Sequence, residues 1–105
     1  MTDGVVEQGV VVETTPEGHV FYWKNGLRHR LDGPAIILAD GTESWFRNGV
    51  AHREDGPAIE FPDGTYMWLK DGIPHREDGP AILYKDGEEF YLLDGKLVDK
   101  SLILV

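Results

Sequence analysis

The chain has 105 residues, 41% of them hydrophobic and 28% charged, which suffices for one small domain but not for separate catalytic and binding lobes. Its 19 acidic and 10 basic side chains give a formal net charge of -9, which disfavours contact with long nucleic acids or an anionic membrane. The absence of cysteine excludes disulfides, thiol nucleophiles and cysteine metal sites.

The N-terminal segment "MTDGVVEQGV" carries acids where a secretory signal would carry basic residues. No apolar run in the chain approaches the ~20 residues that span a bilayer. Together with the lack of cysteine, these features predict a cytoplasmic protein with no membrane partner.

One phrase recurs every 23 residues: "HRLDGPAI" from His29, then "HREDGPAI" from His52 and from His75. A fixed period of this length indicates stacked copies of one supersecondary unit. We predict a single repeat domain over residues 1–105. It would hold a degenerate N-terminal copy or cap (1–25), three full units (26–94) and a C-terminal cap strand (95–105).

Each unit contains a predicted β-hairpin. The turns are expected at Asp40-Gly41, Asp63-Gly64 and Asp86-Gly87, because Asp-Gly between β-prone runs is typical of a two-residue type I′ turn. Such a turn would set Ile37 opposite Ser44 and Ile36 opposite Trp45. No stretch shows helical periodicity. We therefore expect an all-β fold of about eight to ten short antiparallel strands, with the hairpin repeats stacked into an elongated twisted sheet.

This arrangement places apolar side chains on both faces of the sheet, and soluble monomers rarely leave such surfaces bare. The cover would come from curling of the sheet, from the apolar chain ends, from a second copy or from another protein. The last four residues, "LILV", are expected to form a strand that pairs with a sheet edge.

The repeated polar residues first suggest acid–base or metal chemistry. His29, His52 and His75 are each followed three residues later by an aspartate: Asp32, Asp55 and Asp78. Equivalent histidines in a stacked sheet would lie ~10 Å apart, whereas a zinc ion holds its nitrogen ligands at ~2.1 Å. A loop role is the better interpretation, in which each aspartate accepts hydrogen bonds from backbone N–H groups or from the adjacent arginine. We predict no catalytic residue, no metal site and no cofactor.

An aromatic column is the candidate partner-binding site. It comprises Tyr22, Trp45, Trp68 and Tyr91, with Tyr66 beside it and with Arg47, Lys70 and Lys24 projecting beyond the rings. Aromatic residues and arginine dominate interface hot spots. The alternative is that the column simply forms core. Stacking of a small nucleotide on these rings is a further alternative.

The chain resembles the MORN repeat family over roughly residues 16 to 95. The matching elements in one unit are Trp45 or Phe46, Asn48-Gly49, His52 and Pro62-Asp63-Gly64. They recur at Trp68 or Leu69, Asp71-Gly72, His75 and Lys85-Asp86-Gly87. Here "HREDGPA" delays the glycine that usually follows the histidine, so the repeat looks more like a variant found in phage and bacterial proteins. The resemblance implies stacked antiparallel hairpins used for binding and scaffolding, and it implies no reaction.

These features together predict a non-catalytic protein-binding module. The resemblance suggests a phage-type inhibitor of a host bacterial defence protein, which would act in the host cytoplasm. One alternative is a purely structural repeat protein that forms a homo-oligomer such as a dimer. Another is an acidic DNA mimic that presents columns of aspartates, although turn chemistry already accounts for those aspartates.

Overall fold

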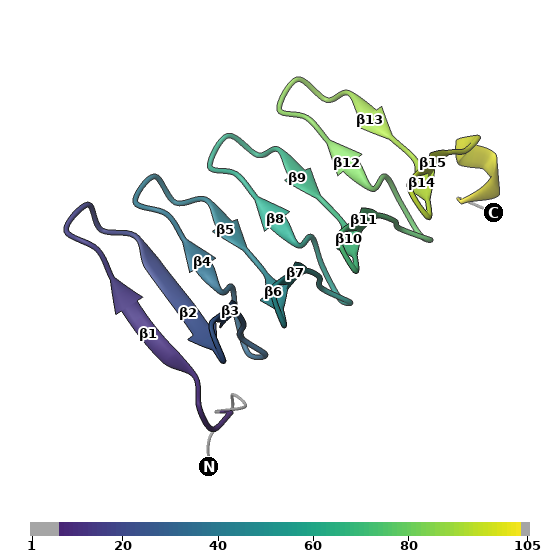
Figure 1. Cartoon of the computed structure of the whole chain (residues 1–105). Coiled ribbons are helices and arrows are strands. Elements are labelled where there is room, and N and C mark those ends of the chain that lie inside the picture. Colours follow the sequence, from purple (N-terminus) through teal and green to yellow (C-terminus); the bar gives the residue numbers. More distant parts are fainter. Residues whose placement is uncertain (1–6, 104–105) are drawn as a thin grey trace, which may run out of the picture.

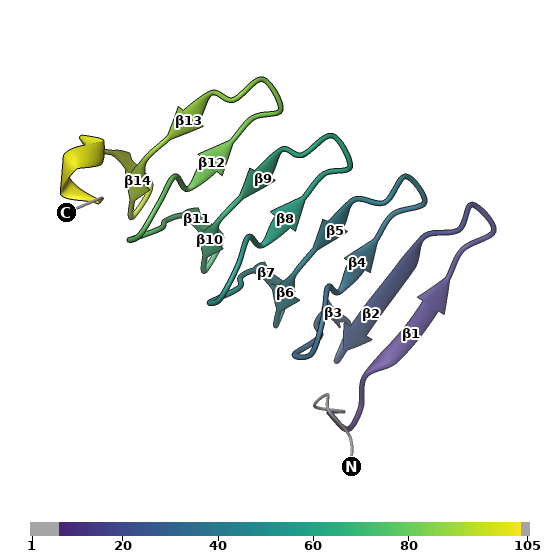
Figure 2. The same cartoon turned by 180° about the vertical axis from the view of Figure 1, so that it is seen from behind.

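The computed structural model describes residues 7–103, which form a ladder of antiparallel hairpins. The hairpins lie side by side along one direction, and the two ends of the chain lie at opposite ends of the ladder (Figure 1). Seen from behind, the same order holds (Figure 2). The molecule measures 43 × 28 × 26 Å along its principal axes. The structure thus confirms the predicted all-β fold with antiparallel hairpins in an extended sheet.

The long hairpins build one nine-stranded sheet. Its strands follow each other in the order β1 (Val11–Thr14), β2 (Val20–Lys24), β4 (Ile36–Ile37), β5 (Glu43–Ser44), β8 (Ile59–Glu60), β9 (Tyr66–Met67), β12 (Ile82–Leu83) and β13 (Glu89–Phe90). β3 (Leu27–Arg28) also pairs with β2. The strands of this sheet are thus arranged in chain order, and the connections from β5 to β8 and from β9 to β12 are longer than the turns within the hairpins.

A short second hairpin follows each long one, and the sequence analysis did not predict it. These hairpins are β6 (Phe46–Arg47) with β7 (Val50–Ala51), β10 (Leu69–Lys70) with β11 (Ile73–Pro74), and β14 (Leu92–Leu93) with β15 (Lys96–Leu97). Each forms a separate two-stranded sheet along one margin of the ladder (Figures 1 and 2). The described residues thus hold fifteen strands, more than the eight to ten predicted, and a final 3-10 helix, η1 (Lys100–Leu102).

The type I′ turns lie in these short hairpins. Asn48 and Gly49 have φ angles of 51° and 82°, and Asp71 and Gly72 have 52° and 79°. Positive φ at both central residues is what a type I′ turn requires, and asparagine and aspartate tolerate it better than most residues. The rule used on the sequence therefore holds, but at a different set of Asn-Gly and Asp-Gly pairs.

The predicted type I′ turn at Asp40-Gly41 is wrong. The N–H of Leu38 donates to the carbonyl of Thr42 at 2.8 Å, which closes a three-residue loop in which Gly41 alone has positive φ, at 97°. The Asp40 carboxylate accepts a hydrogen bond from the N–H of Thr42 at 2.8 Å. This side-chain bond stabilises the wider loop, as expected for an aspartate in an Asx turn.

The extra loop residue shifts the strand register by one position. Ile36 lies opposite Ser44 and Ile37 lies opposite Glu43, rather than opposite Trp45 and Ser44 as predicted. Because side chains alternate between the two faces of a strand, this shift moves Trp45 off the face that carries Ile36. The predicted grouping of these two residues on one apolar face is therefore wrong.

The core is narrow, and its completely buried hydrophobic residues are alanines. Ala35, Ala58 and Ala81 have no exposed surface, and no large side chain among residues 7–103 is fully buried. Each alanine N–H donates to the neighbouring strand, as Ala35 does to Ser44 at 2.9 Å. A core this thin removes little apolar area from water. Polar contacts between units therefore contribute a larger share of the stability than they do in a globular domain.

The C-terminal end does not form the predicted strand over the described residues. Leu102 belongs to η1, and Ile103 follows it in a turn with 8% of its surface exposed. Leu104 and Val105 lie outside the described residues. Ile103 is therefore a buried residue in a turn at the C-terminal end of the ladder and does not form an edge strand.

Glycine substitutions in the short hairpins should separate backbone strain from crowding. Gly26 and Gly49 both have left-handed φ, but a Cβ at Gly26 meets no atom within 4 Å, whereas one at Gly49 lies 3.2 Å from Leu27 Cδ2. Gly26→Ala should lower the free energy of unfolding by about 1 kcal/mol. Gly49→Ala should lower it further, as measured by urea denaturation. Equal losses of unfolding free energy would show that the Leu27 side chain moves away from the added Cβ at little cost.

The aspartates of the three-residue loops should make the fold sensitive to acid. Hydrogen bonds from the Thr42 and Thr65 N–H groups hold the pKa of Asp40 and of Asp63 below the ordinary value of 3.8. The folded state therefore favours the ionised form, and its advantage is lost as the pH falls through these lowered pKa values. An Asp40→Asn, Asp63→Asn double variant should show a shallower fall in unfolding free energy between about pH 5 and about pH 2. A slope equal to wild type would contradict this origin.

Candidate functional site

The guanidinium groups of three arginines lie over aromatic rings of the predicted column. The distance from the guanidinium carbon to the ring centroid is 4.1 Å for Arg30 over Tyr22, 4.0 Å for Arg53 over Trp45, and 4.0 Å for Arg76 over Trp68. These are cation–π contacts, each worth about 0.5–2 kcal/mol depending on solvent exposure. Three of the four predicted aromatic residues are therefore covered on one face by an arginine of the same protein.

The same arginines are fixed at their edges by hydrogen bonds. Their Nε atoms donate to the carboxylates of Asp32 at 2.9 Å, Asp55 at 3.3 Å and Asp78 at 2.9 Å. Their Nη1 atoms donate to the carbonyls of Pro34 and Pro57 at 3.1 Å and of Pro80 at 3.2 Å. These contacts confirm the predicted loop role of the aspartates. We call each arginine, with its ring, aspartate and proline carbonyl, an arginine clamp.

The glycine of "DGP" makes room for the clamp. A Cβ at Gly56 would lie 2.7 Å from Arg53 Cζ, and one at Gly33 would lie 2.6 Å from Arg30 Cζ. Real Cβ atoms do not approach other atoms this closely, so a larger residue would displace the guanidinium. Arginine, aspartate, glycine and proline in the repeated phrase thus specify one local structure.

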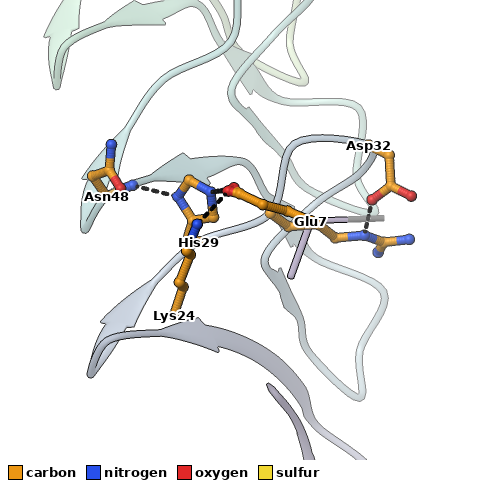
Figure 3. Close-up of polar contacts among 6 residues, drawn as sticks. Glu7, Lys24, His29, Asp32 and Asn48 are labelled. Atoms are coloured by element: carbon orange, nitrogen blue, oxygen red, sulfur yellow. Dashed lines mark hydrogen bonds and ion pairs between the residues drawn. The ribbon is translucent and has the colours of Figure 1, made fainter. Parts of the chain in front are cut away.

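Each histidine directly follows one short hairpin and links it to the turn of the next short hairpin. His29 Nδ1 accepts the backbone N–H of Asn48 at 2.9 Å (Figure 3), and His52 Nδ1 accepts that of Asp71 at 3.0 Å. The His75 ring accepts the N–H of Asp94 in the same way, at 2.9 Å. All three donors belong to type I′ turns of the following short hairpin. Because a backbone N–H can only donate, Nδ1 must be unprotonated and the ring proton of the neutral ring lies on Nε2.

A carboxylate faces each of these Nε2 atoms, but its source differs between units. His52 and His75 face the glutamate two residues later, with Nε2 at 3.5 Å from Glu54 and 3.2 Å from Glu77. The first unit has Leu31 at the corresponding position. There the carboxylate comes from Glu7, which lies before the first strand and whose Oε1 is 2.7 Å from His29 Nε2.

Glu7 also binds Lys24, so its carboxylate lies between two donors (Figure 3). The Lys24 Nζ atom is 2.8 Å from Glu7 Oε2. Hydrogen bonds from Lys24 and then from His29 lower the pKa of Glu7 below its ordinary value of 4.5. The pair formed by Lys24 and His29 is thus a site for an ionised carboxylate, and Arg47–His52 and Lys70–His75 occupy the corresponding sequence positions.

A hollow with a volume of about 490 Å³ lies between the second and third arginine clamps. Its wall holds Trp68, Lys70, His75 and Arg76, and the flanking loops contribute Arg53–Asp55 and Glu77–Asp78. We call this hollow the third-unit groove. It combines one aromatic ring with charges of both signs, and every side chain in it except Lys70 belongs to a clamp or to the repeated loop.

The structure therefore brings together only part of the predicted site. Trp68 and Lys70 share the third-unit groove, and Tyr66 accepts a hydrogen bond from Arg76 at 3.3 Å. Arg47 projects from the second unit, with its Nη1 atom 3.9 Å from Glu54. Tyr91 has no arginine over its ring, because Asp99 stands where the arginine would recur.

Tyr91 instead donates its hydroxyl to Glu89 at 3.1 Å. Partial desolvation and then the hydrogen bond to Glu89 raise its pKa above the ordinary value of 10.0. Tyr22 and the two tryptophans Trp45 and Trp68 are half-buried under their guanidinium groups. One face of each of these three rings is thus already occupied by an arginine.

Two features of the candidate site were not predicted from the sequence. The bond from a histidine to a turn 19 residues later leaves no local signal, since both residues repeat with the same period. The role of Glu7 had one indirect signal, namely that Leu31 replaces the glutamate found at Glu54 and Glu77. That replacement leaves one histidine of three without a carboxylate from its own loop.

Among residues 7–103, no three histidine, aspartate or glutamate side chains lie close enough together to hold a metal ion. The same part of the chain contains no helix long and apolar enough to cross a membrane. Comparison of the chain with protein-family models, with curated proteins and with solved structures gives no match.

A double-mutant cycle should show that glycine and arginine act as one unit in the second clamp. Arg53→Ala removes the cation–π contact and should lower the unfolding free energy by about 1–2 kcal/mol. Gly56→Ala alone should cost as much, because its Cβ would clash with Arg53. In the Arg53→Ala background the Gly56→Ala substitution should cost little, as measured by urea denaturation. Additive losses would contradict a steric link between the two residues.

Proposed function

We propose that this chain is a non-catalytic protein-binding module and that the third-unit groove is its contact surface. The observation that supports this proposal most strongly is the hollow of about 490 Å³ around Trp68 and Lys70. Its mixture of an aromatic ring, arginine and lysine suits a protein surface better than a small apolar ligand. The cation of Arg76 is already ordered over the ring of Trp68, so binding would immobilise few additional side-chain rotamers.

A non-catalytic role agrees with how the repeated polar groups are used. The Nδ1 atoms of His29, His52 and His75 accept backbone N–H groups. The aspartates three residues later pair with arginines, as in the bond from Arg76 to Asp78. A general acid or base needs a free nitrogen or oxygen that reaches a substrate proton. The Nδ1 atoms instead accept turn N–H groups, and the aspartates bond arginines of their own loops.

The resemblance of the repeats to the MORN family gives the proposal a specific form. The variant found in phage and bacterial proteins suggests an inhibitor that binds a host bacterial protein, such as a defence component, in the cytoplasm. Such a partner would need a complementary surface for an acidic chain of net charge -9. This form rests on the resemblance, whereas the binding role rests on the groove.

A second candidate role is self-association through the edge of the sheet. β1 pairs only with β2 among the described residues, and Val11 and Val12 on it are 61% and 52% exposed. An open strand edge with apolar side chains can template pairing with another chain. This candidate predicts a homo-oligomer that forms without any other protein.

Charge reversal in and beside the groove tests the proposed function. The variant Arg47→Glu, Lys70→Glu changes two cations on the proposed surface, and Lys85→Glu, Lys96→Glu is a matched control on exposed hairpins. In capture experiments from bacterial lysate, wild type and the control should retain a common protein. The groove variant should bind it at least about tenfold more weakly, because like charges across an interface cost several kcal/mol.

Circular dichroism should show the same β spectrum for all three proteins, since the changed side chains lie on the surface. Retention of the same protein by the groove variant would contradict the assignment of the contact surface. A homo-oligomer in light scattering, with no captured protein, would favour the self-association candidate.

A further inference from the structure

In the first unit, the carboxylate of Glu7 from the same chain occupies the site between Lys24 and His29. Glu7 lies outside the three full units, before a turn at Gln8–Gly9 and before β1. Its carboxylate lies 2.8 Å from Lys24 Nζ and 2.7 Å from His29 Nε2 (Figure 3). The lowered pKa of Glu7 agrees with a site that prefers the ionised carboxylate. The N-terminal segment therefore shows how an acidic peptide can dock on one unit.

The third unit repeats the same pair of donors in a more open setting. Lys70 and His75 correspond to Lys24 and His29, and both line the third-unit groove. In the first unit the space that remains beside the N-terminal segment is only about 170 Å³, and Glu7, Val10 and Val12 form part of its wall. The larger volume of the third-unit groove agrees with a site that no segment of residues 7–103 has entered.

The only carboxylate near His75 Nε2 in the described structure is weakly placed. Glu77 lies 3.2 Å from that nitrogen, but 80% of its side chain is exposed to solvent. Exposed pairs of this kind contribute little, so Glu77 can turn into water at small cost. Asp78 is unavailable as a competitor because it accepts the Nε donor of Arg76. A carboxylate from another molecule could thus replace Glu77 between the two donors.

We propose that the third-unit groove binds a glutamate-bearing peptide segment of a partner, whose carboxylate lies between Lys70 Nζ and His75 Nε2. The inference rests on the proposed protein-binding function and adds the chemistry of the partner. The flanking residues of the ligand are small and apolar, as Val10 and Val12 are beside Glu7. Trp68, under its arginine, provides the apolar wall that such residues contact.

A peptide titration of the full-length protein tests this site. The probe is the blocked hexapeptide "EQGVVV", the sequence of residues 7–12, and its control is "QQGVVV", which lacks only the charge. Binding is followed by NMR through the Trp68 indole and the Lys70 and Glu77 backbone amides. We expect saturable shifts at these positions with the glutamate peptide, and binding of the glutamine peptide that is about fivefold weaker.

Three surface variants sharpen the test. Lys70→Gln should weaken binding of the glutamate peptide about fivefold, because it removes one of the two donors. Glu77→Gln should strengthen binding by a few-fold, because it removes the competing carboxylate. Lys85→Gln, on an exposed hairpin turn away from the groove, should leave the affinity unchanged. Equal binding of both peptides, or no saturable shift at Trp68, would overturn the inference.

The outcome for this inference can be separated from that for the proposed function. If the captured protein depends on Lys70 while neither peptide binds, the partner uses the groove without a carboxylate, so the function stands and the inference fails. If the glutamate peptide binds as expected but no protein is captured, the carboxylate site stands and the proposed contact with a separate protein fails.

Discussion

One kind of hydrogen bond sets the relation between successive short hairpins: a turn N–H donates to the ring of the histidine that directly follows the preceding short hairpin. His29 is 3% exposed and His52 is 9% exposed, so their rings are held where an unpaired nitrogen would be costly. The donors, Asn48 and Asp71, have positive φ, so the N–H is available to the ring only when the type I′ turn has formed. Folding of each turn is therefore linked to its contact with the preceding unit, which is the nearest-neighbour coupling expected of repeat proteins.

The arginine clamps cover aromatic rings along one face of this array. Because alanines form the buried column and large side chains are only partly buried, the tryptophans stay near the surface under guanidinium groups instead of entering a core. The resulting face is rigid, charged and locally aromatic. Variation is then confined to a few positions, such as Leu31, Glu54 and Glu77, which decide where the carboxylate beside each histidine comes from. The same scaffold can thus hold its own segment in one unit and present an open groove in another.

The sequence predicted the all-β fold, and it indicated the adjacent arginine as one of two possible partners of each loop aspartate, because both follow from short-range chemistry. It did not predict which Asp-Gly or Asn-Gly pairs form type I′ turns, since Asp63-Gly64 and Asp71-Gly72 are the same dipeptide. In the three-residue loop at Asp63, the aspartate carboxylate accepts the N–H of Thr65. At Asp71, the backbone N–H of the aspartate instead donates to His52 Nδ1. The histidine, which lies 19 residues before Asp71, is identified as the partner only from the three-dimensional structure. Glu7 was missed for the same reason, because its two donors lie 17 and 22 residues away.

The tautomers of the histidine rings test this account most directly. Long-range ¹H–¹⁵N NMR spectra at neutral pH distinguish a proton on Nε2 from one on Nδ1. The structure predicts the Nε2–H tautomer for His29, His52 and His75, with Nδ1 accepting the turn N–H in each case. Rings with the proton on Nδ1, or rings that exchange between both tautomers, would contradict the histidine-to-turn link on which the stacking of the units depends.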